Sequence, residues 1–149
     1  MRISNACLAL SAAVLLSACA ATGPKHSEMR ASMPQLKADQ GRIYFYRSSS
    51  MFGAAIQPSI TLNGRTVGES KPGGFFYVDE PAGPKEVSTS TEVEKKLTFT
   101  LERGQTRYVR TSVGFGVAVG RVYPELVDNA TGEKELQETS YTGAPTAQR

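Results

Sequence analysis

The dipeptide Asn63-Gly64 stands between two short runs in which apolar and polar residues alternate, residues 59–62 and 65–68. A two-residue type I′ hairpin needs positive φ at both turn positions, and asparagine and glycine adopt that conformation most readily. The pair therefore predicts a β-hairpin, with Ile60, Leu62 and Val67 as candidate core residues. This is the clearest local structural signal in the chain.

Similar short runs, rich in aromatic and β-branched residues, recur with turn sequences between them. They predict further strands at 42–47, 75–78, 85–91, 97–101, 106–113 and 122–127. The run 85–91 alternates weakly and suits an exposed strand, whereas Pro124 favours an edge position for the last strand. Such spacing is typical of a β-sandwich or a small barrel. We predict an all-β fold, a small antiparallel β-sandwich of about seven strands, with a short C-terminal helix over 133–138.

Residues 1–18 have the features of a signal peptide. Arg2 is a minimal basic region, and the apolar run 6–16 that follows is shorter than the roughly 20 residues a spanning helix needs. The run closes with Leu16-Ser17-Ala18-Cys19, which resembles the lipobox of bacterial lipoproteins. The resemblance implies cleavage by signal peptidase II between Ala18 and Cys19 and lipidation of the Cys19 thiol. An ordinary secretory signal with an incidental Cys19 and an uncleaved transmembrane anchor are the weaker alternatives.

A lipidated Cys19 would tie the chain to a membrane of the cell envelope, because two or three acyl chains give stable attachment. Ala20 follows the cysteine, and in Gram-negative lipoproteins that choice favours the outer membrane, with the domain facing the periplasm. The polar stretch 19–40 contains His26, the single histidine, and predicts a flexible tether in which that histidine is solvated. The β-sandwich domain is expected over 41–138 and a disordered tail over 139–149.

Six short segments follow one another along the chain: 42–47, 63–68, 74–76, the Pro81-Ala82-Gly83 turn, 101–108 and Leu126-Val127. Their order resembles that of a family of bacterial lipoproteins defined as a domain of unknown function, DUF2846. The resemblance covers about residues 41–138. The layout is also similar to PEGA-type and transthyretin-like sandwiches. The family carries no established catalytic residues, so the resemblance implies no catalytic site in this chain.

The residue content gives little support for catalysis, cofactors or metals. A hydrolytic triad needs a base beside its nucleophile, and the single histidine lies in the expected tether. Cys7 and Cys19 both precede the domain, which excludes a disulfide or thiolate metal site within it. Residues 128–133 have calcium-loop residue types without the full spacing, so a β-turn is favoured. The net charge of +3, with both signs interspersed, gives no reason to expect nucleic acid as a partner.

The glycine-rich segment 114–120 is the least ordinary part of the sequence. Its glycines do not have the spacing of a dinucleotide-binding loop, and no helix follows them. One interpretation is a glycine-bent hairpin or bulge, and it is the one we favour. The other is an apolar loop that meets lipid or a partner protein, for which Phe52, Phe115 and Val117 are the candidate interaction residues.

The sequence therefore favours a lipid-anchored, non-catalytic envelope protein whose domain binds an envelope protein or cell-wall component. A purely structural lipoprotein is a second hypothesis. The alternative from another class is an envelope enzyme that acts on glycan or cell-wall substrate through two carboxylates facing one cleft. Asp79 and Glu80 are adjacent carboxylates, but we expect them to lie in a solvated turn ahead of Pro81.

Overall fold

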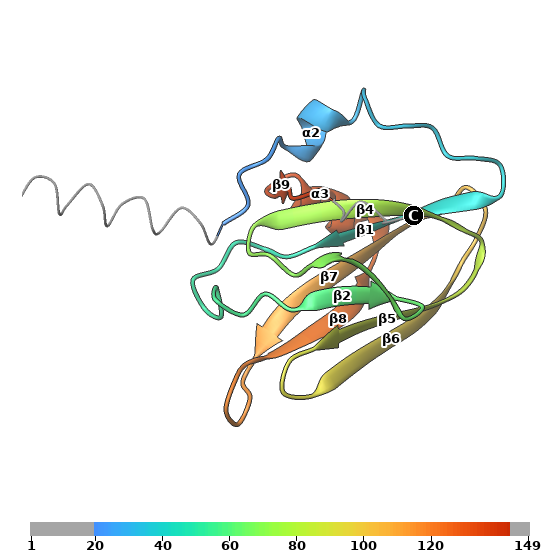
Figure 1. Cartoon of the computed structure of the whole chain (residues 1–149). Coiled ribbons are helices and arrows are strands. Elements are labelled where there is room, and N and C mark those ends of the chain that lie inside the picture. The colour runs from blue at the N-terminus through green and yellow to red at the C-terminus, as the bar shows by residue number, and fades with distance from the viewer. Residues whose placement is uncertain (1–19, 144–149) are drawn as a thin grey trace, which may run out of the picture.

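The computed structural model describes residues 20–143, which form two β-sheets packed against each other (Figure 1). The sheets have the strand orders β8-β7-β1-β4-β9 and β3-β2-β5-β6. The strands are β1 Gln40–Tyr46, β2 Ser59–Leu62, β3 Arg65–Glu69, β4 Gly74–Pro81, β5 Gly83–Ser90, β6 Glu94–Leu101, β7 Thr106–Gly114, β8 Arg121–Val127 and β9 Ser140–Tyr141. Two helices accompany them, α2 at His26–Met29 and α3 at Asn129–Leu136. The all-β, sandwich-like fold is confirmed, with nine strands among the described residues where about seven were expected.

The main core lies between the two sheets and is built from alternate residues of their strands. Ile43 and Phe45 of β1 point inward and are fully buried, and the ring of Phe45 stacks on that of Phe76 with centroids 5.0 Å apart. The other buried members of this cluster are Ile60, Leu62, Val67, Val87, Leu101 and Val109. Each fully buried apolar side chain contributes roughly 1.5–3 kcal/mol. The hairpin residues predicted for the core therefore occupy it.

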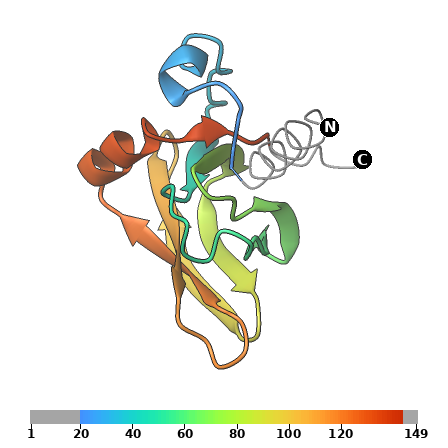
Figure 2. The same ribbon diagram turned by 90° about the vertical axis from the view of Figure 1, so that its left-hand side faces the viewer.

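A second cluster lies on the outer face of the five-stranded sheet. Tyr44 and Tyr46 alternate with the core residues of β1 and join Phe75, Tyr108 and Leu136 there. Figures 1 and 2 show α2 and α3 over this same face. The hydroxyl of Tyr46 donates to the Glu135 carboxylate at 2.7 Å, which ties α3 to the sheet. The five-stranded sheet is thus buried on both faces around β1.

The strand directions differ in part from the predicted antiparallel arrangement. β1 pairs with β4 in antiparallel fashion but with β7 in parallel, and β4 pairs with β9 in parallel. Between β1 and β7 the chain builds β4 and the whole of the other sheet, so it returns to the far edge of β1 in the same direction. Alternation within a strand carries no information about the direction of its neighbours, which is why the sequence could not show this.

The strand expected to be exposed at 85–91 is in fact β5, an interior strand between β2 and β6. Val87 and Thr89 are fully buried. Thr89 Oγ1 donates to the Val122 carbonyl at 2.6 Å, and the hydroxyls of Ser88 and Thr61 lie 2.6 Å apart. A buried hydroxyl with a hydrogen-bond partner is tolerated in a core, so the polar composition of this strand was misleading.

The C-terminal helix begins earlier than expected, at Asn129, and the β-turn favoured for 128–133 is wrong. The side chain of Asp128 accepts a hydrogen bond from Thr131 N at 2.9 Å and acts as the N-cap. Aspartate is a strong N-cap residue, and it satisfies an amide that the first helical turn leaves without a partner. Pro124 lies in β8, which is an edge strand as predicted.

Residues 20–34, which we call the strap, lie against the domain where a flexible tether was expected. Lys25 forms an isolated bridge with Ser140, and the Tyr141 amide donates to the Pro24 carbonyl at 2.8 Å. Met29 and Met33 pack on the outer aromatic cluster. The expected disordered tail also begins too early, since Thr139 and Ser140 are buried and β9 pairs with β4. Both segments are held by backbone hydrogen bonds and isolated apolar side chains, which leave no periodic pattern.

Candidate functional site

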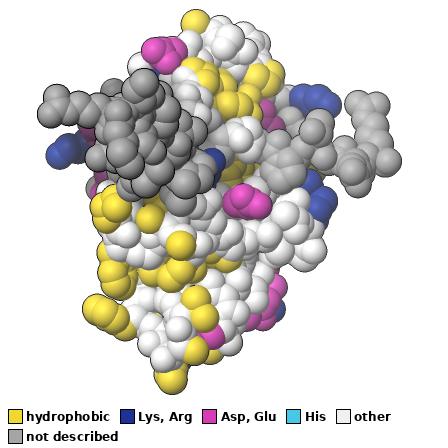
Figure 3. All heavy atoms as spheres, turned by 60° about the vertical axis from the view of Figure 1, so that its left-hand side comes forward, with side chains coloured by type: hydrophobic (Ala, Val, Ile, Leu, Met, Phe, Trp, Pro, Cys, Tyr) yellow, Lys and Arg dark blue, Asp and Glu magenta, His cyan; other side chains and the backbone are white. Residues whose placement is uncertain are grey.

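The structure brings the three predicted interaction residues together at one end of the sandwich. Phe52 lies in the β1–β2 loop, and Phe115 and Val117 lie in the β7–β8 loop. The rings of Phe52 and Phe115 are in contact, with centroids 5.2 Å apart. Phe115 is 86% exposed and Val117 is 91% exposed. Together with their exposed neighbours Met51 and Val119, these residues form what we call the apolar surface. Figure 3 shows hydrophobic side chains gathered along the lower part of this side of the molecule.

The β7–β8 loop is held by a single carboxylate. Glu92, in the β5–β6 turn, accepts hydrogen bonds from the amides of Val117 at 2.8 Å, Ala118 at 3.0 Å and Val119 at 3.3 Å. Its carboxylate also accepts from Arg121 Nε at 3.0 Å. The amide of Ala118, followed by that of Val117, is the main cause that lowers the pKa of Glu92 to about 2. The backbone of this loop therefore has a defined arrangement that presents its apolar side chains outward.

The β1–β2 loop is held by a buried guanidinium. Arg47 Nη1 donates to the Ile56 carbonyl at 2.6 Å, and Nη2 donates to the Gly53 carbonyl at 2.8 Å. Burial lowers the pKa of Arg47, whose guanidinium donates here to backbone carbonyls. The two loops also meet at their base, since a Cβ added at Gly120 would lie 2.5 Å from Ile56 Cδ1. The apolar surface is thus one built unit made from two loops far apart in the sequence.

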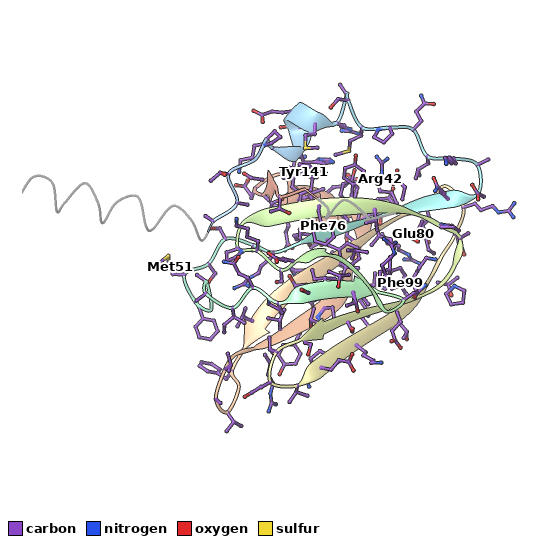
Figure 4. The ribbon with its side chains drawn as sticks, in the orientation of Figure 1. Arg42, Met51, Phe76, Glu80, Phe99 and Tyr141 are labelled. Carbon is purple, nitrogen blue, oxygen red and sulfur yellow. The ribbon has the colours of Figure 1, made fainter. Side chains whose placement is uncertain are left out.

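The predicted lipidation and cleavage residues, Cys19 and Ala18, lie outside the described residues. The described chain begins with Ala20, and the amide of Ala21 donates to the Pro72 carbonyl at 3.3 Å. The next residue of that turn, Gly73, lies beside the β1–β2 loop, because a Cβ added to it would be 3.5 Å from Ser49 Cβ. Figure 4 shows Met51 on the same left-hand side as the start of the described chain. The Pro72-Gly73 turn therefore lies between Ala21 and the β1–β2 loop that carries Met51 and Phe52.

A further cluster, which sequence reasoning missed, lies under the strap. His26 Nε2 is 3.2 Å from the Tyr44 hydroxyl, and its ring makes edge contacts with Tyr44 and Phe75. Burial lowers the pKa of His26, and the nearby Arg30 adds to the effect. The histidine was expected to be a solvated linker residue, which is wrong. One signal in the sequence could have indicated this cluster. Tyr44 and Tyr46 give the first strand an apolar side opposite Ile43 and Phe45, and such a side is usually covered by another part of the chain.

The carboxylates proposed for an enzymatic alternative are held in ion pairs. Asp79 and Glu80 lie within β4, not in the solvated turn that was expected. Asp79 accepts two hydrogen bonds from Arg42, at 2.7 and 2.8 Å, and Glu80 accepts one from Arg65. In a glycosidase two carboxylates face one cleft, whereas here each carboxylate is paired with a different arginine. These contacts do not favour a glycosidase-type pair.

Among residues 20–143, no group of three or more histidine, cysteine, aspartate or glutamate side chains could hold a metal ion. Across the same part of the chain, no helix has the length and apolar character needed to cross a bilayer.

Comparison with known proteins places the chain in a family. Residues 37–122 match the family described as "Protein of unknown function (DUF2846)". The chain belongs to the DUF2846 family. The matched range contains β1 to β7, both loops of the apolar surface and Glu92. The predicted family is therefore confirmed, while the likeness to PEGA-type and transthyretin-like sandwiches stays a prediction.

The DUF2846 chain is also similar to a protein of Haemophilus influenzae (strain ATCC 51907 / DSM 11121 / KW20 / Rd) that bears the name "Uncharacterized protein". The two are 31% identical over 128 residues, which span 83% of this chain and 76% of the relative. No solved structure matches the chain.

Proposed function

We propose that this DUF2846 protein is a lipid-anchored, non-catalytic binding or structural module of the cell envelope. The observation that carries the proposal is the sequence Leu16-Ser17-Ala18-Cys19 at the end of the apolar run 6–16, shortly before Ala21, whose amide donates to the Pro72 carbonyl. A lipobox cysteine becomes the first residue of the mature protein, so the proposed anchor and the folded domain would follow each other without a long spacer. In a Gram-negative cell, Ala20 favours the outer membrane, with the domain in the periplasm.

The non-catalytic part of the proposal is supported by how the carboxylates are used. Glu92 holds a loop, Glu135 links α3 to Arg110 and Tyr46, and Asp79 holds Arg42. Each of these carboxylates accepts hydrogen bonds that hold another part of the fold in place. The apolar surface, by contrast, leaves Met51, Phe115 and Val117 largely exposed. Exposed apolar patches of this kind mark interaction sites more often than catalytic ones.

The anchor is tested by metabolic labelling with a fatty-acid analogue in a bacterial host. The wild-type chain is expected to carry the label, and Cys19→Ser is expected to lose it because a hydroxyl is a poor substitute for the thiol nucleophile. Cys7→Ser is the matched control, since Cys7 lies in the same N-terminal segment but outside the lipobox-like sequence. Label retained by Cys19→Ser would contradict the assignment.

The membrane assignment has its own test. Ala20→Asp is expected to move the labelled protein from the outer-membrane to the inner-membrane fraction on density-gradient separation, because aspartate after the lipidated cysteine favours inner-membrane retention. An unchanged distribution would contradict the assignment to the outer membrane and would leave lipidation itself intact.

A further inference from the structure

We propose that the apolar surface docks on the lipid bilayer that holds the anchor, so that the domain lies on the membrane in one orientation. The occupant of this surface is the lipid of the membrane, not a soluble partner. The inference rests on the proposed lipidation of Cys19, and the experiment below separates the failure of one from the failure of the other.

The first step concerns reach. Cys19 and Ala21 are two residues apart, so their Cα atoms are separated by roughly 7 Å at most. The amide of Ala21 donates a hydrogen bond to the Pro72 carbonyl at 3.3 Å. From there the strap continues along the domain through Pro24 and Lys25. A lipid on Cys19 would therefore hold the Pro72 turn close to the headgroups, with no free tether between them.

The second step concerns which side of the domain faces the membrane. The Pro72-Gly73 turn touches Ser49, which lies two residues before Met51. Figure 1 shows the start of the described chain and the β1–β2 loop on the left of the molecule, with the β7–β8 loop at the lower left. A domain held at Ala21 therefore brings the apolar surface toward the bilayer.

The third step concerns the chemistry of that side. The side chains that protrude furthest are apolar: Met51 is 84% exposed, and Phe115 and Val117 are more exposed still. The carboxylate nearest to them, Glu92, is turned inward onto three amides and Arg121. Three backbone amides of the loop thus already have a hydrogen-bond acceptor in Glu92. This lowers the free-energy cost of bringing the loop into a region poor in water.

The fourth step concerns shape. The apolar side chains protrude from two loop tips, and the Phe52–Phe115 contact joins them into one projection. A protein partner would need a recess complementary to this projection, whereas fluid lipid adapts to it. Aromatic and aliphatic side chains of peripheral proteins commonly enter about 5–10 Å into the boundary between headgroups and acyl chains. Continuity with the anchor and this projecting shape both favour lipid.

The test uses the lipidated full chain, reconstituted in vesicles of phosphatidylethanolamine and phosphatidylglycerol with brominated acyl chains. The sequence contains no tryptophan, so a single tryptophan reports one position. Phe115→Trp places the probe on the apolar surface, and Val117→Trp is a second variant should the first fail to fold. Arg103→Trp is the matched control, because Arg103 is exposed in the β6–β7 turn at the opposite end of the strands.

We expect the tryptophan at 115 or 117 to lose most of its emission in brominated vesicles and to shift to shorter wavelength, while the tryptophan at 103 keeps its emission. If the protein floats with the vesicles but the probes at 115 and 117 behave like the probe at 103, the docking inference is overturned and the anchor stands. If the protein carries no lipid and does not float, the proposed anchor fails and the docking inference fails with it.

Discussion

At the scale of single residues, the β2–β3 turn has the conformation that its two residues require. Asn63 has φ 49° and Gly64 has φ 79°, as expected for a type I′ turn. We predict that Gly64→Val destabilises the domain by about 1–3 kcal/mol, because a β-branched side chain is strongly disfavoured at positive φ. Thermal or urea unfolding measures the loss.

The matched control for this prediction is Gly64→Asn, which tolerates positive φ and should lose much less stability. A Cβ at position 64 would meet no atom within 4 Å, so any loss reports backbone conformation and not a clash. Equal stability of the valine variant and the wild type would contradict the conformational explanation.

At this scale, the features that could be predicted from the sequence are those that depend only on neighbouring residues. The type I′ turn is predicted from the dipeptide Asn63-Gly64, because the positive φ values that the turn needs are adopted by these two residues alone. Phe52 and Phe115 could each be suspected as exposed apolar residues, but their ring contact depends on the packing of two loops that are 63 positions apart. His26 carries no local pattern at all, and its place against Tyr44 follows only from the path of the strap.

At the scale of elements, the β7–β8 loop depends on the Glu92 carboxylate. Oε1 accepts from Val117 and Arg121, while Oε2 accepts from Ala118 and Val119. Glu92→Gln replaces one oxygen with an amide nitrogen, which cannot accept a hydrogen bond. We predict faster hydrogen exchange at the amides of residues 117–119 in this variant, measured by NMR or mass spectrometry.

Glu94→Gln is the control for the loop prediction, because Glu94 is near Glu92 in the sequence but its carboxylate lies 3.7 Å from Lys96 Nζ and not at the loop. It should leave exchange in the loop unchanged. The pH dependence has a definite sign: the pKa of Glu92 is lowered, so its contribution is fully present above the ordinary value of 4.5 and is lost progressively as the pH falls from there through about 2. Rapid hydrogen exchange at the amides of residues 117–119 already at pH 4.5 would contradict the role of Glu92 in holding the loop.

The strap gives a second element-scale prediction, also through pH. The folded state lowers the pKa of His26 below 6.5, so the unfolded chain binds the proton more readily. The stabilising effect of the neutral ring is therefore fully present above about pH 6.5 and decreases as the pH falls below that value. Arg30 and Arg42 disfavour the charged ring further, while Glu133 acts in the opposite direction.

We expect unfolding measurements between about pH 7.5 and 5.5, where histidine titrates, to show this loss in the wild type. His26→Phe keeps an aromatic edge against Tyr44 and Phe75 but cannot titrate, so its stability should vary less over the same interval. A phenylalanine variant with the same pH slope as the wild type would show that another group is responsible.

The elements themselves were partly predictable. The existence of most strands followed from alternation, as in 97–101, where Leu97, Phe99 and Leu101 share one face. The burial of β5 and the parallel pairing of β1 with β7 were not predictable, because both depend on what lies beside the strand. The position of the strap could not be predicted for a different reason. Its contacts are a backbone bridge at Lys25 and the packing of two methionines, and neither forms a periodic pattern.

At the scale of the whole molecule, the covered faces of the sandwich are separate from the end at which apolar side chains are exposed. The outer face of the five-stranded sheet is covered by the strap and α3, and the inner faces form the core. The end that carries the β1–β2 and β7–β8 loops is where the apolar side chains remain exposed. Because the strap runs from Ala21 along the domain, the proposed lipid at Cys19 would fix the orientation of the sandwich on the membrane.

This link can be tested by lengthening the connection between anchor and domain. We predict that a flexible Gly-Ser insertion between Ala20 and Ala21 leaves lipidation intact but reduces the contact of the apolar surface with the bilayer. An insertion of about 20 residues has a root-mean-square span of roughly 25 Å, which lets the domain move away from the headgroups and rotate. In Phe115→Trp chains in brominated vesicles, quenching should fall toward that of the Arg103→Trp control. The same insertion in the β6–β7 turn, at Gly104, keeps the connection short and should leave quenching at position 115 unchanged. Equal quenching with and without the insertion at Ala20 would show that the short connection does not orient the domain.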